Sequence, residues 1–206
     1  MRGKFISFEG GEGSGKSTQT QIICDMLRSD NLEFINTREP GGTKISEKIR
    51  ELVLDAKNEK MSLETEILLF AASRAQLINE VILPTLNSGK TVICDRYLDS
   101  SLVYQGMTCG DNLDIVKCAN KYAMDNCMPD ITLYFDIDPK LAFERKNGAD
   151  KNDRMEMKGM EFHQKVRQGF LRLANMYPER IKIIDASKTR EEVTAQILEA
   201  IRNIGI

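Results

Sequence analysis

Short runs of β-branched and aromatic residues alternate along the chain with longer stretches in which apolar residues recur every three or four positions. The short runs predict five β-strands, at Phe5–Phe8, Glu33–Thr37, Thr91–Cys94, Ile131–Ile137 and Ile181–Ile184. The longer stretches predict helices, at Lys16–Ser29, Lys44–Leu54, Leu63–Asn87, Leu113–Asn126, Pro139–Lys146, Glu156–Tyr177 and Arg190–Ile204. Nearly continuous apolar strands are typical of a parallel sheet buried on both faces. The alternation predicts a single three-layer α/β domain over residues 1–206.

The composition is that of an ordinary soluble protein. Hydrophobic residues make up 41% and charged residues 29% of the 206 positions, and 29 Lys+Arg against 31 Asp+Glu give a net charge of −2. This balance argues against nucleic-acid binding, which needs excess positive charge, and no apolar run approaches the roughly 18 residues of a membrane span. The five cysteines form no C-x-x-C pair, and no signal peptide precedes the first strand. We therefore expect a cytoplasmic protein that contacts neither membrane nor nucleic acid.

A glycine-rich segment directly follows the first predicted strand. It comprises Gly10, Gly11, Glu12, Gly13, Ser14, Gly15, Lys16 and Ser17, with Thr18 next. This is a full match to G-x-x-x-x-G-K-[ST], in which backbone N–H groups of the loop and of the following helix bind phosphate oxygens. In this motif the lysine reaches the β- and γ-phosphates and the serine hydroxyl binds Mg²⁺. Asp95, at the end of a strand, is the candidate second magnesium ligand.

Three classes of nucleotide-binding protein could use such a loop. A guanine-specific GTPase usually carries D-x-x-G and N-K-x-D, but no Asp of this chain precedes a Gly by three positions. The segment Asn120-Lys121-Tyr122-Ala123 has Ala where the final Asp should be. Motor ATPases are usually larger and carry partner surfaces. A kinase with a small acceptor fits best.

Arginines are placed where the predicted strands end, and ligands of an open α/β sheet bind beyond that edge. Arg38 follows the second predicted strand, Arg96 follows the third, and Arg50 lies on a predicted helix. A guanidinium group can bind a phosphate through two parallel hydrogen bonds. These three arginines are therefore candidates for holding an anionic acceptor.

Phe70 and Arg74 lie four residues apart in the long predicted helix, so their side chains share one face. The pair could bind a nucleobase, with the ring stacked on the base and the guanidinium bonded to a carbonyl. Alternatively, Phe70 belongs to the core and Arg74 extends beside it toward solvent. Helical spacing alone favours this second interpretation.

A polar segment from Arg145 to Arg154 follows the fourth strand and its helix, and it contains one glycine. It predicts a lid, at about residues 146–156, that closes over the transferring phosphoryl group and excludes water. The alternative is an ordinary exposed loop.

Four blocks of the chain together resemble bacterial thymidylate kinases. They are Phe8–Thr18, Thr37–Thr43, Phe70–Arg74 and Asp95–Gly106. The blocks occur in the order and spacing of that family, and the Arg-Glu-Pro-Gly-Gly and Asp-Arg-Tyr sequences are specific in combination. The resemblance implies a P-loop NTPase fold with a five-stranded parallel sheet. It also implies a homodimer that uses Mg²⁺ to transfer the γ-phosphoryl group of ATP to dTMP, giving dTDP and ADP.

The resemblance also implies roles for individual residues. ATP would bind at the glycine loop with Arg145 beside the adenine. The implied dTMP-binding residues are Glu12, Arg38, Arg50, Phe70, Arg74, Arg96, Ser101, Tyr104 and Gln105. Among them, Phe70 would stack on thymine and Arg74 would bond its carbonyl, Ser101 and Gln105 would lie near the base edge, Tyr104 near the sugar 2′ position, and Glu12 near the 3′-hydroxyl. Lys16, Arg96 and Arg154 are the implied catalytic residues, Arg154 because the glycine loop contains no arginine.

Two other functions compete with this one. A deoxynucleoside kinase acting on thymidine would need a carboxylate base and no phosphate clamp. A non-catalytic nucleotide-binding module would bind ATP without releasing ADP to an acceptor. The arginines at the strand ends argue against both.

Overall fold

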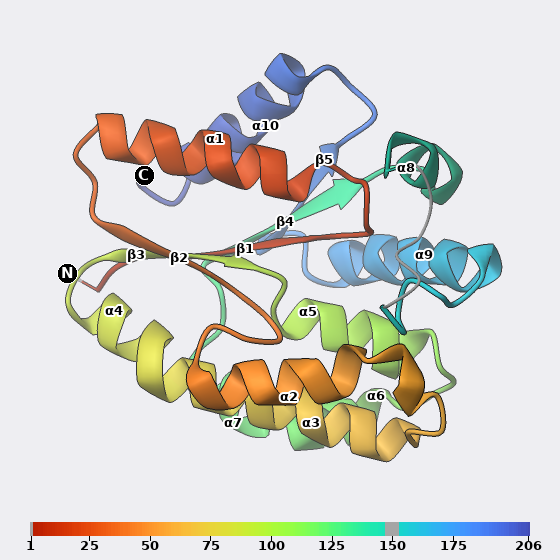
Figure 1. The fold of residues 1–206 in the computed structure, drawn as a ribbon. Helices are drawn as coiled ribbons and strands as arrows, with labels where there is room; N and C mark the ends of the chain where they lie inside the picture. Colours follow the sequence, from red (N-terminus) through yellow and green to blue (C-terminus); the bar gives the residue numbers. More distant parts are fainter. Residues whose placement is uncertain (1, 147–152) are drawn as a thin grey trace.

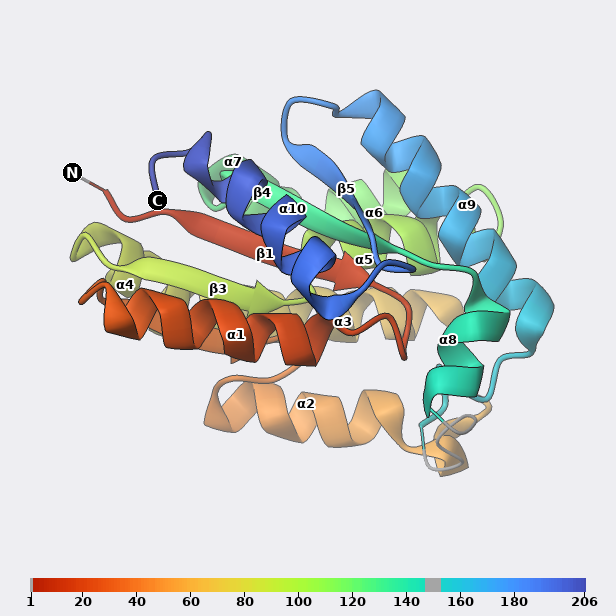
Figure 2. The same ribbon diagram turned by 90° about the horizontal axis from the view of Figure 1, so that it is seen from above.

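Five parallel strands form the centre of the molecule. The structure is a computed structural model, and it describes residues 2–146 and 153–206. The strands are β1 (Phe5–Gly10), β2 (Phe34–Arg38), β3 (Thr91–Asp95), β4 (Ile131–Asp136) and β5 (Ile181–Asp185). They are ordered β2-β3-β1-β4-β5, with helices on both faces (Figures 1 and 2). This arrangement confirms the predicted three-layer α/β fold.

The helices divide into two layers. The helices α1 (Lys16–Ser29) and α10 (Arg190–Arg202) cover one face. The other layer contains α2 (Lys44–Leu54), α3 (Leu63–Leu77), α4 (Leu83–Asn87), α5 (Leu98–Ser101), α6 (Leu113–Ala119), α7 (Lys121–Asn126) and α9 (Met160–Met176). A short helix, α8 (Pro139–Lys146), follows β4 at the carboxyl end of the sheet. Three short segments complete the helices, namely the 3₁₀ turn η1 (Ala56–Asn58) and the π-helical η2 (Ile78–Ile82) and η3 (Leu102–Met107).

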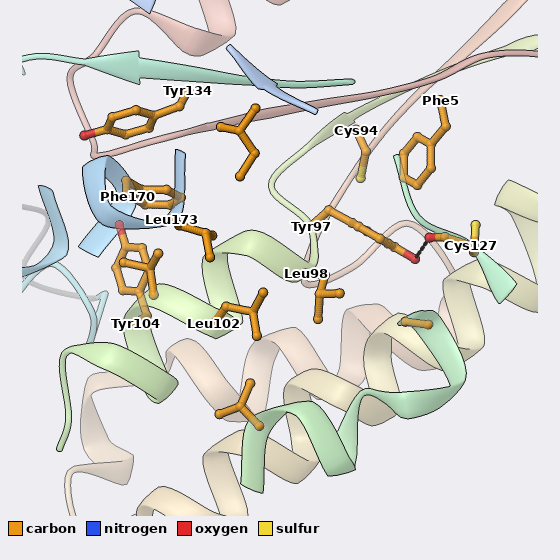
Figure 3. Close-up of a cluster of buried hydrophobic side chains, with 14 of the residues drawn as sticks. Phe5, Cys94, Tyr97, Leu98, Leu102, Tyr104, Cys127, Tyr134, Phe170 and Leu173 are labelled. Atoms are coloured by element: carbon orange, nitrogen blue, oxygen red, sulfur yellow. Dashed lines mark hydrogen bonds between the residues drawn. The ribbon is translucent and has the colours of Figure 1, made fainter. Parts of the chain in front are cut away.

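Each face of the sheet contributes to its own apolar cluster, because successive strand residues point to opposite faces. Phe5 and Ile6 are neighbours in β1 and belong to different clusters. In the cluster beneath the sheet, the rings of Tyr134 and Phe170 stack with centroids 4.7 Å apart (Figure 3). Full burial of one such side chain stabilises a fold by about 1.5–3 kcal/mol. The sheet is thus anchored on both sides, and its carboxyl edge is a rigid platform.

The helix from Leu63 to Asn87 is continuous through α3, η2 and α4, as predicted. Among the described residues it is the one helix long and apolar enough to cross a membrane, judged by length and composition. Several of its apolar side chains instead pack inside the protein. Four of them are fully buried beneath the sheet, namely Leu77, Ile78, Ile82 and Leu86. It is a core helix of the domain.

Two predicted helices depart from the prediction by an interruption or by more than two residues at one end. The helix expected at Leu113–Asn126 divides at Asn120, whose buried side chain accepts a hydrogen bond from Arg74 and donates one to the carbonyl of Val116 at 2.9 Å. The helix expected from Glu156 begins at Met160, because Asp153 accepts hydrogen bonds from the backbone N–H groups of the next residues and holds them in a turn.

Candidate active site

The glycine loop adopts a phosphate-binding conformation between β1 and α1. Gly13 and Gly15 have positive φ angles of 71° and 87°, and a Cβ on Gly13 would lie 2.1 Å from the carbonyl oxygen of Ala142. Ser14 closes the loop by donating to the carbonyl of Gly11 at 2.7 Å. The N-cap residue of α1 is Gly15, which has no side chain to cap the helix, so the N–H groups of the first turn can bind a phosphate. The structure therefore supports the predicted loop.

Lys16 folds back across this loop. Its Nζ donates to the carbonyl oxygens of Gly10 and Gly11, each at 3.0 Å. Burial lowers the pKa of Lys16, and the positive charge of Arg96 lowers it further. The carboxylate of Glu12 raises this pKa, but by less than the two other effects lower it. A bound phosphate would favour the charged ammonium, so this lysine is placed to gain from an anionic ligand.

Ser17 and Asp95, the predicted magnesium ligands, fit a divalent cation. Ser17 is exposed in the first turn of α1, as is Thr18. Asp95 ends β3, and its buried Oδ1 accepts no hydrogen bond from the described residues. Within residues 2–146 and 153–206 no group of three or more His, Cys, Asp or Glu could hold a metal. Mg²⁺ usually takes one or two protein oxygens and completes its shell with phosphates and water, which matches this pair.

A pocket opens next to the phosphate loop, between the segments that follow β2 and β3. Its lining includes eight of the nine predicted acceptor residues, namely Glu12, Arg50, Phe70, Arg74, Arg96, Ser101, Tyr104 and Gln105. The ninth, Arg38, does not line it and instead pairs with Glu47 at 2.8 Å. The pocket is the candidate acceptor site.

Positive charge concentrates at one end of this pocket. Burial lowers the pKa of Arg50, and the neighbouring guanidinium of Arg38 lowers it further, with a smaller effect from Arg96. Arg50 also donates to the carbonyl of Pro40 at 2.9 Å. Arg38 and Arg96, predicted to follow strands, are thus both close enough to repel Arg50, which was predicted on a helix. Such a cluster favours an anion between them.

Arg96 connects the phosphate loop to the acceptor pocket. Its guanidinium pairs with Glu12 of the loop, and its Nη1 lies 3.4 Å from the hydroxyls of both Ser100 and Tyr104. Burial alone would raise the pKa of Glu12, but Arg96, Lys16 and Lys146 outweigh it and hold that pKa well below its usual value. Glu12 is therefore a fixed anion between cations.

Arg74 is almost completely buried, which rules out the interpretation that it extends to solvent. Its guanidinium pairs with Glu39, through Nε at 2.7 Å, and donates to Asn120, to the carbonyl of Tyr97 at 3.2 Å and to Ser101 Oγ at 3.1 Å. These bonds use four of the five N–H groups of an arginine. The second Nη1 hydrogen has no acceptor among the described residues, and Arg74 is part of the pocket lining. Phe70, one turn earlier, is half-buried in the same lining.

Glu9 organises the segment that carries Arg96, and sequence reasoning missed it. This fully buried carboxylate of β1 accepts hydrogen bonds from the backbone N–H groups of Tyr97 and Ser100, at 2.7 and 3.3 Å, and from Ser100 Oγ at 2.6 Å. It thereby replaces a local cap for α5, a helix that the sequence pattern did not predict because no capping side chain precedes it. The sequence feature that could have indicated this role is the position of Glu9, a charged residue inside the apolar strand β1.

Glu9 should make the stability of the fold depend on pH. Burial raises its pKa from 4.5 to about 7. Between these values the folded protein retains a proton that the unfolded chain has released, so the free energy of unfolding falls as the pH rises. We expect Glu9→Gln to flatten part of this fall, with the rest due to Glu39, whose pKa burial also raises to about 7. Urea unfolding at about pH 5 and about pH 8 measures the difference. An unchanged slope would contradict a buried, titrating Glu9.

The arginines predicted for the lid lie apart from one another. Arg145 donates to the carbonyls of Ala186 and Ser187 beyond β5, at 2.7 and 3.2 Å. Arg154 pairs with Glu66 of α3 at 2.7 Å and is not at the phosphate loop. Among the described residues of the lid, the cation that contacts the loop is Lys146, whose Nζ lies 3.9 Å from Glu12. Residues 147–152, the middle of the predicted lid, lie outside the described residues.

Comparisons with known proteins identify the family. A family model described as thymidylate kinase matches residues 8–197. The chain belongs to the thymidylate kinase family. The thymidylate kinase of Finegoldia magna is 47% identical over 198 residues, which cover 96% of this chain and 97% of that protein. The thymidylate kinase of Caldanaerobacter subterraneus subsp. tengcongensis is 47% identical over 201 residues, which cover 98% and 96% of the two chains.

A solved structure of the family has the same architecture. The crystal structure of thymidylate kinase from Ehrlichia chaffeensis matches with a TM-score of 0.78 at 31% identity, covering 98% of this chain and 99% of that one. Membership of the thymidylate kinase family confirms the resemblance, the P-loop NTPase fold and the enzyme class that were predicted from sequence.

Proposed function

We propose that this chain transfers the γ-phosphoryl group of ATP to dTMP, giving dTDP and ADP, in the cytoplasm. The proposal rests on the position of the phosphate loop beside the acceptor pocket. The phosphate loop with its lysine lies beside a pocket that Arg50 and Arg96 line, and Arg38 is close enough to Arg50 to lower its pKa. Two anionic ligands placed there would meet end to end, and the family membership supports thymidylate as the acceptor.

On the donor side, the loop residues Gly10 to Thr18 bind the phosphates of ATP, and Arg145 lies toward the adenine. Lys16 Nζ exchanges its loop carbonyls for phosphate oxygens. Ser17 and Asp95 would hold Mg²⁺. When bound, the ion would neutralise the phosphates and stabilise the charge that develops during transfer.

On the acceptor side, Arg38, Arg50 and Arg96 hold the monophosphate, which supplies the anion that their mutual repulsion favours. Phe70 stacks on the thymine, and the remaining N–H group of Arg74 donates to a base carbonyl. The other four predicted contacts lie around the nucleoside, with Ser101 and Gln105 at the base edge, Tyr104 at the 2′ position and Glu12 near the 3′-hydroxyl.

No general base is required for this reaction. The second pKa of a phosphate monoester is near 6, so dTMP is largely a dianionic nucleophile at pH 7. The main barrier is instead the repulsion between two charged phosphates. Lys16 and Arg96 reduce this repulsion, and the pocket orients the acceptor before transfer. A deoxynucleoside kinase would need a base, and the lowered pKa of Glu12 makes that carboxylate a poor one.

The domain and lid are part of the same proposal. Residues 1–206 form one domain, and the lid at about residues 146–156 brings Arg154 to the transferring phosphoryl group. Because Arg154 pairs with Glu66 in the structure, it would have to leave that carboxylate when ATP binds.

We also assign a homodimer to this chain. Large apolar side chains remain exposed on helices that pack together on one side of the molecule. They are Ile45 and Leu52 of α2, Leu68 of α3, Ile115 of α6 and Tyr122 of α7. A second copy would cover them, and sedimentation equilibrium measures the resulting mass.

The acceptor decides between the competing functions. We expect ADP release with ATP and Mg²⁺ to depend on dTMP and to be far slower with UMP or thymidine, measured in a coupled assay with each acceptor separately. Turnover of thymidine but not of dTMP would select the deoxynucleoside kinase. ATP binding without acceptor-dependent ADP release would select the non-catalytic module.

A further inference from the structure

Glu66 of α3 is a buried carboxylate that the proposed reaction does not use. It is 2% exposed. Its Oε1 accepts a hydrogen bond from Nε2 of Gln105 at 2.7 Å, and its Oε2 accepts one from Nη2 of Arg154 at 2.7 Å. One carboxylate therefore joins a side chain of the acceptor pocket to the segment at the end of the lid.

Glu66 determines which way the Gln105 amide faces. An ionised carboxylate only accepts hydrogen bonds, so the amide must present its NH₂ group to Glu66. Gln105 lines the acceptor pocket, and its Oε1 accepts no hydrogen bond from the described residues. The oxygen that remains is an acceptor, and it is available to a donor on the bound base.

Arg154 holds the Glu66 carboxylate in position, because its Nη2 donates to Oε2 of Glu66 at 2.7 Å. Without this guanidinium, Oε2 of Glu66 would lose its partner and the carboxylate would no longer be fixed against Gln105. The side chain of Arg154 is 10% exposed, and its Nε also donates to the carbonyl of Val53 at 3.1 Å. This second bond ties the guanidinium to the end of α2. The cation is thus held against Glu66 from two sides.

We propose that Glu66 is a specificity-determining positioning residue, which orients Gln105 as a hydrogen-bond acceptor for the ring N3–H of the acceptor base. The inference rests on the proposed function, since it assumes that a nucleoside monophosphate binds in this pocket. Thymine and uracil carry a hydrogen on N3, whereas N3 of cytosine is an acceptor. With cytosine, the N3 acceptor of the base would therefore face the Oε1 acceptor of Gln105. A site that loses a hydrogen bond in this way rejects the ligand strongly.

The test replaces Glu66 with its isosteric amide. In Glu66→Gln the new side chain can donate or accept, so the Gln105 amide can take either orientation. We expect the ratio of the Kd for dCMP to the Kd for dTMP, measured by calorimetry without ATP, to fall by about tenfold or more. The ratio for dUMP against dTMP should stay within about twofold, because both bases donate from N3. A general loosening of the pocket would change both ratios.

Matched variants separate orientation from structure. Glu64→Gln, on the exposed face of the same helix, should leave both ratios unchanged. Glu66→Asp keeps an acceptor-only carboxylate and should retain most of the dCMP discrimination. In a Gln105→Ala background, Glu66→Gln should have no further effect. If Glu66→Gln fails to fold by thermal unfolding, Arg154→Met tests the same carboxylate without altering α3, and the dCMP ratio should again fall.

A wild-type dCMP ratio in a folded Glu66→Gln, or in Arg154→Met where the first does not fold, would overturn the proposal. An equal change in the dUMP ratio would also overturn it. Turnover of dTMP by the wild-type chain is measured separately. The absence of turnover would count against the proposed function. The Kd ratios for dCMP and for dUMP against dTMP test the role of Glu66 instead.

Discussion

Replacing Lys16 with alanine is expected to lower kcat by a factor on the order of 10²–10³ or more, because the variant lacks the ammonium that offsets charge on the transferring phosphoryl group. The fold should survive the change. Lys16 is buried with a pKa that burial lowers, so its removal eliminates a desolvated charge. The rate follows from a coupled assay at saturating ATP and dTMP, and the fold from the thermal unfolding midpoint.

A control for Lys16→Ala is Lys165→Ala, since Lys165 lies on an exposed face of α9 and pairs with Glu161. This variant should keep the wild-type rate. If Lys16→Ala turned over near the wild-type rate while folded, the phosphate loop would not be the donor site.

Arg96 should be as important, and its effect should be largest in kcat/KM for dTMP. We expect Arg96→Ala to lower this value by on the order of 10³, because the variant loses a cation from the monophosphate cluster and leaves Glu12 without its main partner. Steady-state rates with dTMP varied at fixed ATP measure the loss. The KM for ATP should change far less, because Arg96 lies on the acceptor side of the loop.

The backbone at Arg96 provides a second measurement. Its φ angle is 65°, a left-handed backbone conformation that residues with a Cβ atom rarely adopt. Glycine tolerates this conformation and alanine does not, so Arg96→Gly should be more stable than Arg96→Ala by about 1 kcal/mol. Both variants should lose activity equally. A stable, active Arg96→Gly would show that the backbone, and not the guanidinium, is what the site requires.

Local patterns accounted for the strands and for the donor half of the site. All five predicted strands occur, and each differs from its prediction by at most two residues at an end. Apolar runs between turn-forming residues are set by neighbours in sequence, and so is the loop that ends at Lys16 and Ser17. Arg38 and Arg96 also lie at the ends of neighbouring strands, with Arg38 in register with Asp95, because parallel strands end at one edge.

Contacts between distant segments accounted for what the patterns missed. The helix α5 forms because Glu9 of β1 accepts from its first N–H groups, across 88 residues or more of sequence. Asn120 interrupts a helical pattern because Arg74 needs an acceptor there. Arg154 lies against Glu66 although its place in the lid sequence suggested the phosphate loop.

By itself, the amino-acid sequence determined the order of strands and helices, the phosphate loop and the family resemblance, all of which depend on residue types at short, fixed spacings. Only the tertiary structure decided how the buried charges pair. A carboxylate such as Glu9, Glu39 or Glu66 can be buried only where another segment supplies donors or a cation, and the sequence does not state which segment that is. Those pairings orient Arg74, Arg96 and Gln105 around the acceptor pocket.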